Sequence, residues 1–353
     1  MLASSSVRHR ATMAAVVLLA AAVAVSAARA KNECHSGDKA ALLAIMSTLG
    51  SNASSFQSWN SDTPCCDWTN VFCSNVSSTS PYTARRVIGL SLQDDDILAG
   101  PFPGAAIAGL TTLQQLLMIN VPGVKGTIPH DLTRLNATLS FVDISSTGIS
   151  GPVPSFLSEI TALGHLRLST NKLTGPIPAS LGDMPNLYFL DLSNNRLTGT
   201  LPRLLFSKAS DYYSDKYLYL SHNKLTGSVP AEFATVNFWG LDLSHNGFTG
   251  DASFLFGVNK SLDYLNLSHN VFDFNFSAVQ LPVNLDGLDL SHNHIYGDIP
   301  DQVVDVTVTY FNVSYNRLTG VVPTGGTMFW FDASCFQHNK GLCGTPLPPC
   351  IKH

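Results

Sequence analysis

The sequence is poor in charged residues and lacks a basic excess. Lysine, arginine, aspartate and glutamate make up 13% of its 353 residues, and the formal net charge is -5 at pH 7. Without the first 30 residues, which carry three arginines, the net charge is about -8. A protein that binds a polyanion usually has the opposite balance, so we expect no nucleic-acid partner.

Long apolar runs are missing after the first 30 residues, so we expect no membrane span, which needs roughly 18 apolar residues. In the first 30 residues, Arg8 and Arg10 precede an apolar run, and Ala28-Arg29-Ala30 fits a cleavage site. This pattern is typical of a secretory signal peptide, and the run is too short and alanine-rich for the alternative of a membrane-spanning helix. We therefore expect a secreted protein of the extracellular space and cell wall, without a kinase domain or a lipid anchor.

Motifs of catalysis are absent as well. The sequence has no P-loop, no GxSxG, no HExxH and no pair of CxxC motifs. We therefore expect a protein that is not an enzyme and that holds no cofactor and no metal.

Cysteine is missing from the middle of the chain and gathers near its two ends, at Cys34, Cys65, Cys66, Cys73, Cys335, Cys343 and Cys350. This distribution suits an oxidising compartment, and the odd count leaves at least one thiol unpaired or paired outside the chain. Seven sequons permit N-glycosylation on the same secretory route, at Asn52, Asn75, Asn136, Asn259, Asn266, Asn275 and Asn312.

Between the two ends the sequence repeats itself. A segment of about 24 residues with the pattern LxxLxLSxNxLTGxIP recurs some ten times over residues 87–323. The first apolar residue of each LxL is Leu90, Leu116, Val142, Leu166, Leu190, Leu218, Leu241, Leu265, Leu288 or Phe311. The pattern predicts an α/β leucine-rich-repeat solenoid, a right-handed superhelix in which each repeat adds one strand to a concave parallel sheet.

The domain organisation follows from this repeat. We assign residues 1–30 to a signal peptide, 31–86 to an N-terminal cap, 87–323 to about ten repeats and 324–353 to a C-terminal cap. Caps stapled by disulfides would cover the terminal repeats, whose outer faces have no neighbour. In the first cap, residues 38–46 predict an amphipathic helix, and Trp59 and Trp68 supply bulk to cover the first strand. An insertion at residues 210–214 is expected to bulge from the outer side.

Position within the repeat predicts the role of each residue. The leucines point inward, and the glycine and proline of TGxIP supply positive φ and a fixed bend. A buried amide can satisfy backbone groups where the chain turns off the strand, which is the expected role of Asn171, Asn195, Asn223, Asn246, Asn270, Asn293 and Asn316.

The residues that flank the strand leucines are expected to face solvent on the concave side. The middle column of LxL holds Ser91, Leu117, Asp143, Arg167, Asp191, Tyr219, Asp242, Asn266, Asp289 and Asn312. The column before the strand leucine holds Gly89, Gln115, Phe141, His165, Phe189, Tyr217, Gly240, Tyr264, Gly287 and Tyr310. One position earlier come Tyr188, Lys216, Trp239, Asp263 and Asp286.

These columns predict a protein-binding face, because exposed aromatic residues are costly on a bare surface and interfaces are enriched in tyrosine, tryptophan and arginine. The candidate partner-binding residues are Arg167, Tyr188, Phe189, Tyr217, Tyr219, Trp239, Asp242, Tyr264 and Asp289. The alternative for each aromatic residue is packing on its neighbours as a cross-strand ladder.

Aspartates gather toward the C-terminal end of this face, at Asp242, Asp263, Asp286 and Asp289. They predict attraction to a cationic partner surface. Asp263 and Asp286 should lie about 5 Å apart, a separation that matches a retaining glycosidase pair. We disfavour that alternative because an open sheet offers no cleft that excludes water and grips a sugar.

Four histidines, His222, His245, His269 and His292, precede the asparagine of successive repeats. A metal site is conceivable but disfavoured for polar residues at this position. Imidazoles with a pKa near 6.5 would become charged in an acidic cell wall and offset the neighbouring aspartates. We therefore predict that the affinity for a partner changes between roughly pH 5 and pH 7.

The two cap segments SWNSDTPCCDWTNVFC and NKGLCGTPLPPC, together with the ten repeats, resemble plant polygalacturonase-inhibiting proteins over residues 31–350. The resemblance implies a protein that binds fungal or insect endo-polygalacturonases through its concave face and limits pectin degradation in plant defence. An acidic face would complement the cationic cleft that an enzyme acting on pectate needs.

The same resemblance implies the disulfides Cys34–Cys65, Cys66–Cys73 and Cys343–Cys350, with Cys335 left over. Such proteins usually have two further cysteines where this chain has Thr319 and Gly341, so we expect one cap disulfide to be missing.

Other partners stay open at this point. The second interpretation is an extracellular leucine-rich-repeat module in developmental signalling, which binds a peptide or a receptor ectodomain. A weak contact with pectin itself is disfavoured by the negative net charge but permitted by local lysine and arginine patches. We expect a monomer.

Overall fold

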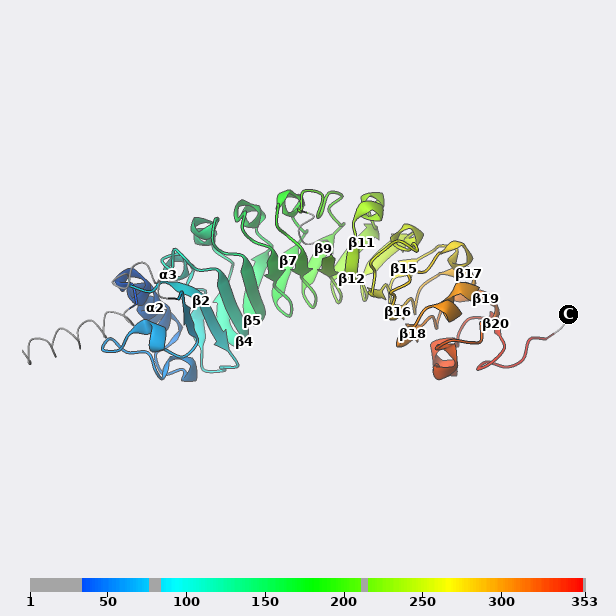
Figure 1. Ribbon diagram of the computed structural model, residues 1–353, viewed down its shortest axis with the longest axis horizontal. Helices are drawn as coiled ribbons and strands as arrows, with labels where there is room; N and C mark the ends of the chain where they lie inside the picture. The colour runs from blue at the N-terminus through cyan, green and yellow to red at the C-terminus, as the bar shows by residue number, and fades with distance from the viewer. Residues whose placement is uncertain (1–33, 76–83, 211–214, 352–353) are drawn as a thin grey trace, which may run out of the picture.

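The computed structural model describes residues 34–75, 84–210 and 215–351. The predicted signal peptide and residues 211–214 of the predicted insertion lie outside these ranges. The coils stack side by side into one arc, with the N-terminal cap at one end and the C-terminal cap at the other (Figure 1). Within these three ranges, none of the helices has the length and apolar character that a bilayer crossing requires.

The concave sheet is parallel and takes one strand from each repeat. Its strands are β2 (Val87–Gln93), β4 (Gln115–Gly126), β5 (Phe141–Pro152), β6 (His165–Arg167), β8 (Phe189–Asp191), β10 (Lys216–Tyr219), β12 (Phe238–Asp242), β14 (Tyr264–Asn266), β16 (Gly287–Asp289) and β18 (Tyr310–Asn312). The ten apolar residues predicted to share one position pair strand by strand from Leu90 to Phe311, so the predicted register and the solenoid are confirmed.

A second run of short strands follows the turn off the concave sheet. It contains β3 (Ala99–Pro101), β7 (Lys172–Gly175), β9 (Arg196–Gly199), β11 (Lys224–Ser228), β13 (Gly247–Gly250), β15 (Val271–Phe272), β17 (Tyr296–Asp298), β19 (Arg317–Val321) and β20 (Gly341–Cys343). The glycine of the LTG motif ends several of these strands at positive φ, as at Gly175 (77°) and Gly199 (83°), where a side chain would be strained.

Short helices complete most coils on the outer side of the arc. They are α3 (Gly104–Ile107), η3 (His130–Leu135), η4 (Ser155–Glu159), η5 (Ala179–Asp183), η6 (Ala231–Thr235), η7 (Ser253–Leu255), η8 (Phe276–Ala278) and η9 (Asp301–Asp305). Most of the η helices begin after the proline of the repeat, whose fixed φ suits the entry into a helical turn.

The asparagine column ties neighbouring coils together, as predicted. The Nδ2 of Asn195 donates to the carbonyls of Leu168 (2.9 Å) and Leu192 (3.1 Å), and its Oδ1 accepts from the backbone N–H of Leu173 (2.9 Å). Each such amide satisfies backbone groups of two coils that the turn leaves without a ladder partner. The inward leucines, such as Leu190, are fully buried in one continuous core.

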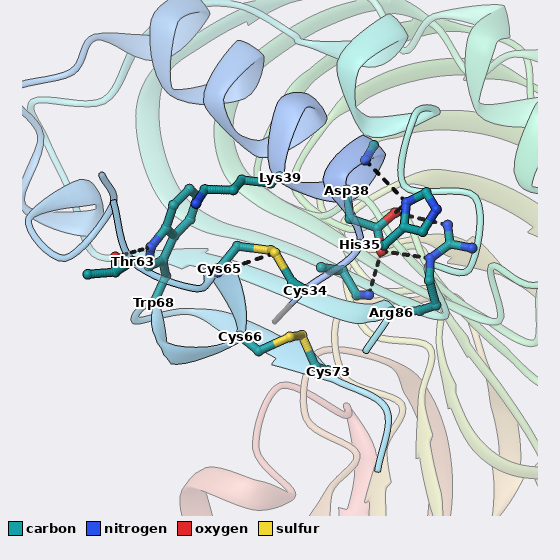
Figure 2. Close-up of a disulfide and its surroundings, with 12 residues drawn as sticks. Cys34, His35, Asp38, Lys39, Thr63, Cys65, Cys66, Trp68, Cys73 and Arg86 are labelled. Atoms are coloured by element: carbon teal, nitrogen blue, oxygen red, sulfur yellow. Dashed lines mark hydrogen bonds and ion pairs between the residues drawn. A yellow bond between two sulfur atoms is a disulfide. The ribbon is translucent and has the colours of Figure 1, made fainter. Parts of the chain in front are cut away.

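The N-terminal cap is a separate small structure tied to the first repeat. It contains helix α2 (Ser36–Leu49), η1 (Ser54–Phe56), η2 (Cys65–Asp67) and the antiparallel strand β1 (Val71–Cys73), which pairs with β2. Figure 2 shows the disulfides Cys34–Cys65 and Cys66–Cys73, and both are confirmed.

Two packed pairs hold this cap in place. The Trp59 and Trp68 rings stack on each other at 5.2 Å, and both are buried. Asp38 is fully buried and accepts from the Arg86 guanidinium (2.9 Å) and from the backbone N–H of Val87 (2.8 Å) (Figure 2). A buried carboxylate needs such partners because its desolvation is costly.

The C-terminal cap instead continues the repeat in a shortened form, with η10 (Met328–Trp330) and η11 (Ala333–Cys335) before β20. Asn339 extends the asparagine column, because its Nδ2 donates to Val313 O (3.0 Å) and its Oδ1 accepts from Leu318 N–H (3.0 Å). The disulfide Cys343–Cys350 is confirmed, and Cys335 is a free, half-buried thiol. Thr319 and Gly341, where two further cysteines were expected, lie opposite each other on β19 and β20.

Candidate partner-binding face

The candidate site is the solvent side of the concave sheet between β5 and β18. Adjacent strands bring the predicted residues into register, and Tyr219 pairs with Asp242 while Phe189 pairs with Tyr217. Arg167 is exposed and Asp289 is buried, whereas seven are half-buried, namely Tyr188, Phe189, Tyr217, Tyr219, Trp239, Asp242 and Tyr264. They form one surface, and their role in binding stays a prediction.

Aromatic rings on β5, β6 and β8 stack on each other. The His165 ring lies between Phe141 (3.9 Å) and Phe189 (4.0 Å), nearly parallel to both, and Phe189 continues toward Tyr217 (5.8 Å) and Tyr219 (5.6 Å). This is the cross-strand ladder that the sequence left as the alternative for these residues. Burial lowers the pKa of His165 to about 4, and the charge of Arg167 adds to the effect.

Arg167 is held between two buried carboxylates on neighbouring strands. Its Nε lies 3.0 Å from Asp191 Oδ2, and its Nη1 lies 3.8 Å from Asp143 Oδ2. Asp143 Oδ1 is buried and accepts no hydrogen bond from any described residue. Burial raises the pKa of the Asp143 carboxyl, which the Ser145 hydroxyl and the Arg167 charge oppose. Arg167 therefore compensates charge within the fold as well as facing solvent.

Aspartate and asparagine in the middle column also close a local turn. One side-chain oxygen accepts from the backbone N–H of the serine two residues later, in the pairs Asp191–Ser193, Asp242–Ser244, Asn266–Ser268, Asp289–Ser291 and Asn312–Ser314. This role was not predicted, although the recurring D/N-x-S spacing indicates it. Either side chain supplies the acceptor, so the turn does not require the negative charge.

The acidic end of the face is confirmed as a set of neighbours. Asp263 and Asp286 precede adjacent strands, and the backbone N–H of Asp286 donates to Asp263 O (2.8 Å). Burial and the nearby Asp286 charge raise the pKa of Asp263. The Thr309 hydroxyl donates to Asp286 Oδ2 (2.9 Å).

The histidine ladder is longer than predicted. Its rings stack at 4.0–4.1 Å in the order His222, His245, His269, His292, Tyr315 and His338. The rings lie nearly parallel, at interplanar angles of 12–18°, and closer together than the roughly 4.8 Å between neighbouring strands. All six residues have positive φ. Among the described residues no group of three or more histidine, cysteine, aspartate or glutamate side chains is placed to hold a metal.

The sequons fall into two groups. Five asparagines are exposed, at Asn52, Asn75, Asn136, Asn259 and Asn275. Asn266 and Asn312 are half-buried on the concave face, where a glycan would stand in the way of a partner. Occupancy of all seven stays a prediction.

A curved parallel sheet with an aromatic, partly acidic solvent face and capped ends defines a leucine-rich-repeat binding protein. The model described as "Leucine rich repeat N-terminal domain" matches residues 35–74, and the "Leucine Rich Repeat" model matches residues 162–184, 186–207 and 216–236.

Whole-chain comparisons narrow this class to a family. The chain is 38% identical over 333 residues to polygalacturonase inhibitor 2 of Arabidopsis thaliana, covering 94% of this chain and 97% of that protein. It is 41% identical over 318 residues to leucine-rich repeat protein FLOR 1 of Arabidopsis thaliana, covering 90% and 93%. The chain belongs to the polygalacturonase-inhibitor family of leucine-rich-repeat proteins, and these are binding proteins without enzymatic activity.

A solved structure of a plant ice-binding protein is also similar, with 42% identity, a TM-score of 0.83 and coverage of 90% of this chain and 99% of that one. One scaffold therefore serves different ligands, and the function has to be argued from the concave face.

Proposed function

We propose that the protein is a secreted inhibitor that binds fungal or insect endo-polygalacturonases through its concave face and thereby limits pectin degradation in the plant cell wall. The observation that supports this most is the whole-length similarity to a polygalacturonase inhibitor, with both caps and all ten strands in register.

The face itself is compatible with this partner. An enzyme that grips polyanionic pectate needs a cationic cleft, and Asp242, Asp263 and Asp286 give one end of the face the opposite sign. The stacked rings from Phe141 to Tyr219 supply rigid apolar area beside it, which costs little entropy to order on binding.

The test is an inhibition assay with the purified protein against a panel of fungal endo-polygalacturonases. We expect reduced release of reducing sugar by at least one enzyme, and direct binding to that enzyme. Trp239→Ala should weaken this binding about 10-fold or more, because a half-buried tryptophan is a typical interface anchor, while the melting temperature stays unchanged.

The absence of both inhibition and binding across the panel would remove the proposal and favour the module in developmental signalling. Equal losses of binding and of stability in Trp239→Ala would show that the ring serves the fold rather than the partner.

A weak contact with pectin stays a prediction beside this function. Three exposed basic residues begin β7, β9 and β11, each directly after the recurring asparagine of its repeat, namely Lys172, Arg196 and Lys224. They form a local cationic patch on an otherwise acidic protein.

A further inference from the structure

Glycine and tyrosine alternate along the C-terminal half of the concave sheet. Gly240, Tyr264, Gly287 and Tyr310 pair in register on β12, β14, β16 and β18. Two residues further along the same strands, the paired residues are Asp242, Asn266, Asp289 and Asn312. Strands with a Gly-x-Asp sequence therefore alternate with strands that carry tyrosine and asparagine.

The glycines leave room for tyrosine rings from the preceding strand. A Cβ atom at Gly240 would lie 2.6 Å from the Tyr219 hydroxyl oxygen, and one at Gly287 would lie 2.7 Å from the Tyr264 ring. Each Gly-x-Asp strand is thus covered on one side by a tyrosine and has a second tyrosine on its other side. We call the space around each aspartate, between its two flanking tyrosines, a notch. The two notches differ on the preceding strand, where Tyr219 pairs with Asp242 but Asn266 pairs with Asp289.

The notch around Asp289 is closed. Asp289 Oδ1 accepts from Ser291 N–H (2.9 Å), its Oδ2 accepts from the Tyr310 hydroxyl (2.9 Å), and the residue is only 7% exposed. Both carboxylate oxygens are therefore engaged within the fold.

The notch around Asp242 is open. Its Oδ1 accepts from Ser244 N–H (2.9 Å), but its Oδ2 accepts no hydrogen bond from any described residue, and the side chain is partly exposed. Tyr264 holds the place that Tyr310 has in the other notch, yet its hydroxyl accepts from Asn266 Nδ2 (3.3 Å) instead of donating to the aspartate.

The other two aspartates of this column share the Arg167 cation: Asp143 lies 3.8 Å from Nη1, although its Oδ1 is buried and has no hydrogen-bond partner among the described residues. Asp191 pairs with Arg167 Nε at 3.0 Å. Asp242 is thus the aspartate of the column whose second oxygen faces solvent between two tyrosines, Tyr219 and Tyr264. Both tyrosines lie close enough that the Asp242 charge contributes, after burial, to raising their pKa values.

We infer that Asp242, Tyr219 and Tyr264 form a receptor for one arginine side chain of the partner protein. A guanidinium can hydrogen-bond to Asp242 Oδ2 with a planar edge and lie against the tyrosine rings, which a compact ammonium does less well. The inference rests on the proposed function, since the arginine belongs to the polygalacturonase that the concave face binds.

The discriminating variant is Asp242→Asn. Asparagine keeps the turn, because Asn266 and Asn312 accept from their serine N–H groups at 3.0 and 3.1 Å. Each aspartate-to-asparagine substitution used here also creates a sequon with the following serine, so all proteins are produced in a host without N-glycosylation, and then only the charge is lost. The matched control is Asp251→Asn on the outer side, where the exposed aspartate closes the same kind of turn with Ser253 N–H (2.7 Å). All variants should retain the melting temperature of the wild type.

We expect Asp242→Asn to raise the dissociation constant for an inhibited enzyme about 10-fold or more, whereas Asp251→Asn leaves it unchanged. Asp289→Asn, in the closed notch, should raise it by no more than about threefold. Equal losses for Asp242→Asn and Asp289→Asn would overturn the receptor and indicate a general field of negative charge.

A second measurement does not need the enzyme. N-acetyl-arginine amide, titrated to millimolar concentration, should shift the amide resonances of Gly240 and Tyr264, and Asp242→Asn should abolish the shifts while Asp251→Asn retains them. If the wild-type resonances do not move, the inference is wrong even where an enzyme is inhibited. If the resonances shift but no enzyme binds, the arginine receptor is supported and the proposed function is wrong.

Discussion

In the two halves of the concave face, the same columns of the repeat hold side chains with different roles. From β5 to β8 the rings stack on each other and Arg167 neutralises the buried Asp191, so the side chains mostly satisfy one another. From β10 to β18 glycine alternates with tyrosine, and Asp242 keeps one oxygen free. The repeat thus sets where a side chain stands, and its neighbours on adjacent strands decide whether it is available to a partner.

The largest effect that tests this comparison is expected from Arg167→Ala. The substitution leaves the buried Asp143 and Asp191 without their cation, so we expect the free energy of unfolding to fall by about 3 kcal/mol in urea denaturation. Arg167→Lys should lose less, because it keeps the charge without the planar fork.

Arg196→Ala on the next repeat is the matched control. The Arg196 side chain is exposed and makes no hydrogen bond or ion pair with any residue that the structure describes, so its loss should cost less than about 0.5 kcal/mol. Equal stability of the two alanine variants would show that Arg167 is as free as Arg196 and would remove the distinction between the two halves.

The sequence predicted the scaffold well because the repeat constrains it many times over. All ten strand positions and the amide contacts of the asparagine column, such as those of Asn195, are confirmed. The three disulfides are confirmed too, but the family resemblance implied them, since the cysteines lie outside the repeats. The histidine ladder was predicted too short, because the prediction considered only histidines. Any flat ring can stack at this position, and the ladder continues through Tyr315 to His338.

The free carboxylate could not be predicted in the same way. Asp242 and Asp289 occupy one column and precede the same L-S sequence, so a one-dimensional pattern treats them alike. They differ in their neighbour on the preceding strand, which is Tyr219 for Asp242 and Asn266 for Asp289. They also differ in a hydroxyl contact from the following strand, which Tyr310 makes and Tyr264 does not. Such a contact depends on side-chain torsion angles rather than on spacing.

A smaller effect is expected from pH through His165. Its folded-state pKa of about 4 lies below the unfolded value of about 6.5, so the unfolded chain binds more protons between these values. Stability is therefore fully present above about pH 6.5 and is lost as the pH falls toward 4, by on the order of 1–2 kcal/mol after discounting for the exposed part of the ring.

His165→Phe isolates this contribution. A phenyl ring keeps the stack between Phe141 and Phe189 but does not titrate, so the variant should lose less stability than the wild type between pH 7 and pH 4. Urea denaturation of both proteins across this range measures the difference. Parallel stability curves would mean that another group carries the pH dependence.

The smallest effect is expected in the other half, from the histidine ladder. Burial and the neighbouring imidazoles lower the pKa values of His245 and His269, while the carboxylates of Asp242 and Asp289 oppose the shift for His245, and Asp289 opposes it for His269. The sign is the same as for His165, so the ladder should lose stability as the pH falls below about 6.5. The rings are largely solvated, which keeps the effect small.

The double variant His245→Asn and His269→Asn tests the ladder without a backbone penalty, because Asn194 already holds this position at positive φ. We expect the wild type to lose at most about 2 °C more in melting temperature than the variant between pH 7 and pH 5. Protonated rings would also offset the Asp242 charge, so the wild-type affinity for a cationic partner should fall on acidification more than that of the variant. The variant could change the pH dependence of the melting temperature but not the pH dependence of the affinity. The ladder would then have only a structural role, and Asp242 would remain the group that decides binding in this half.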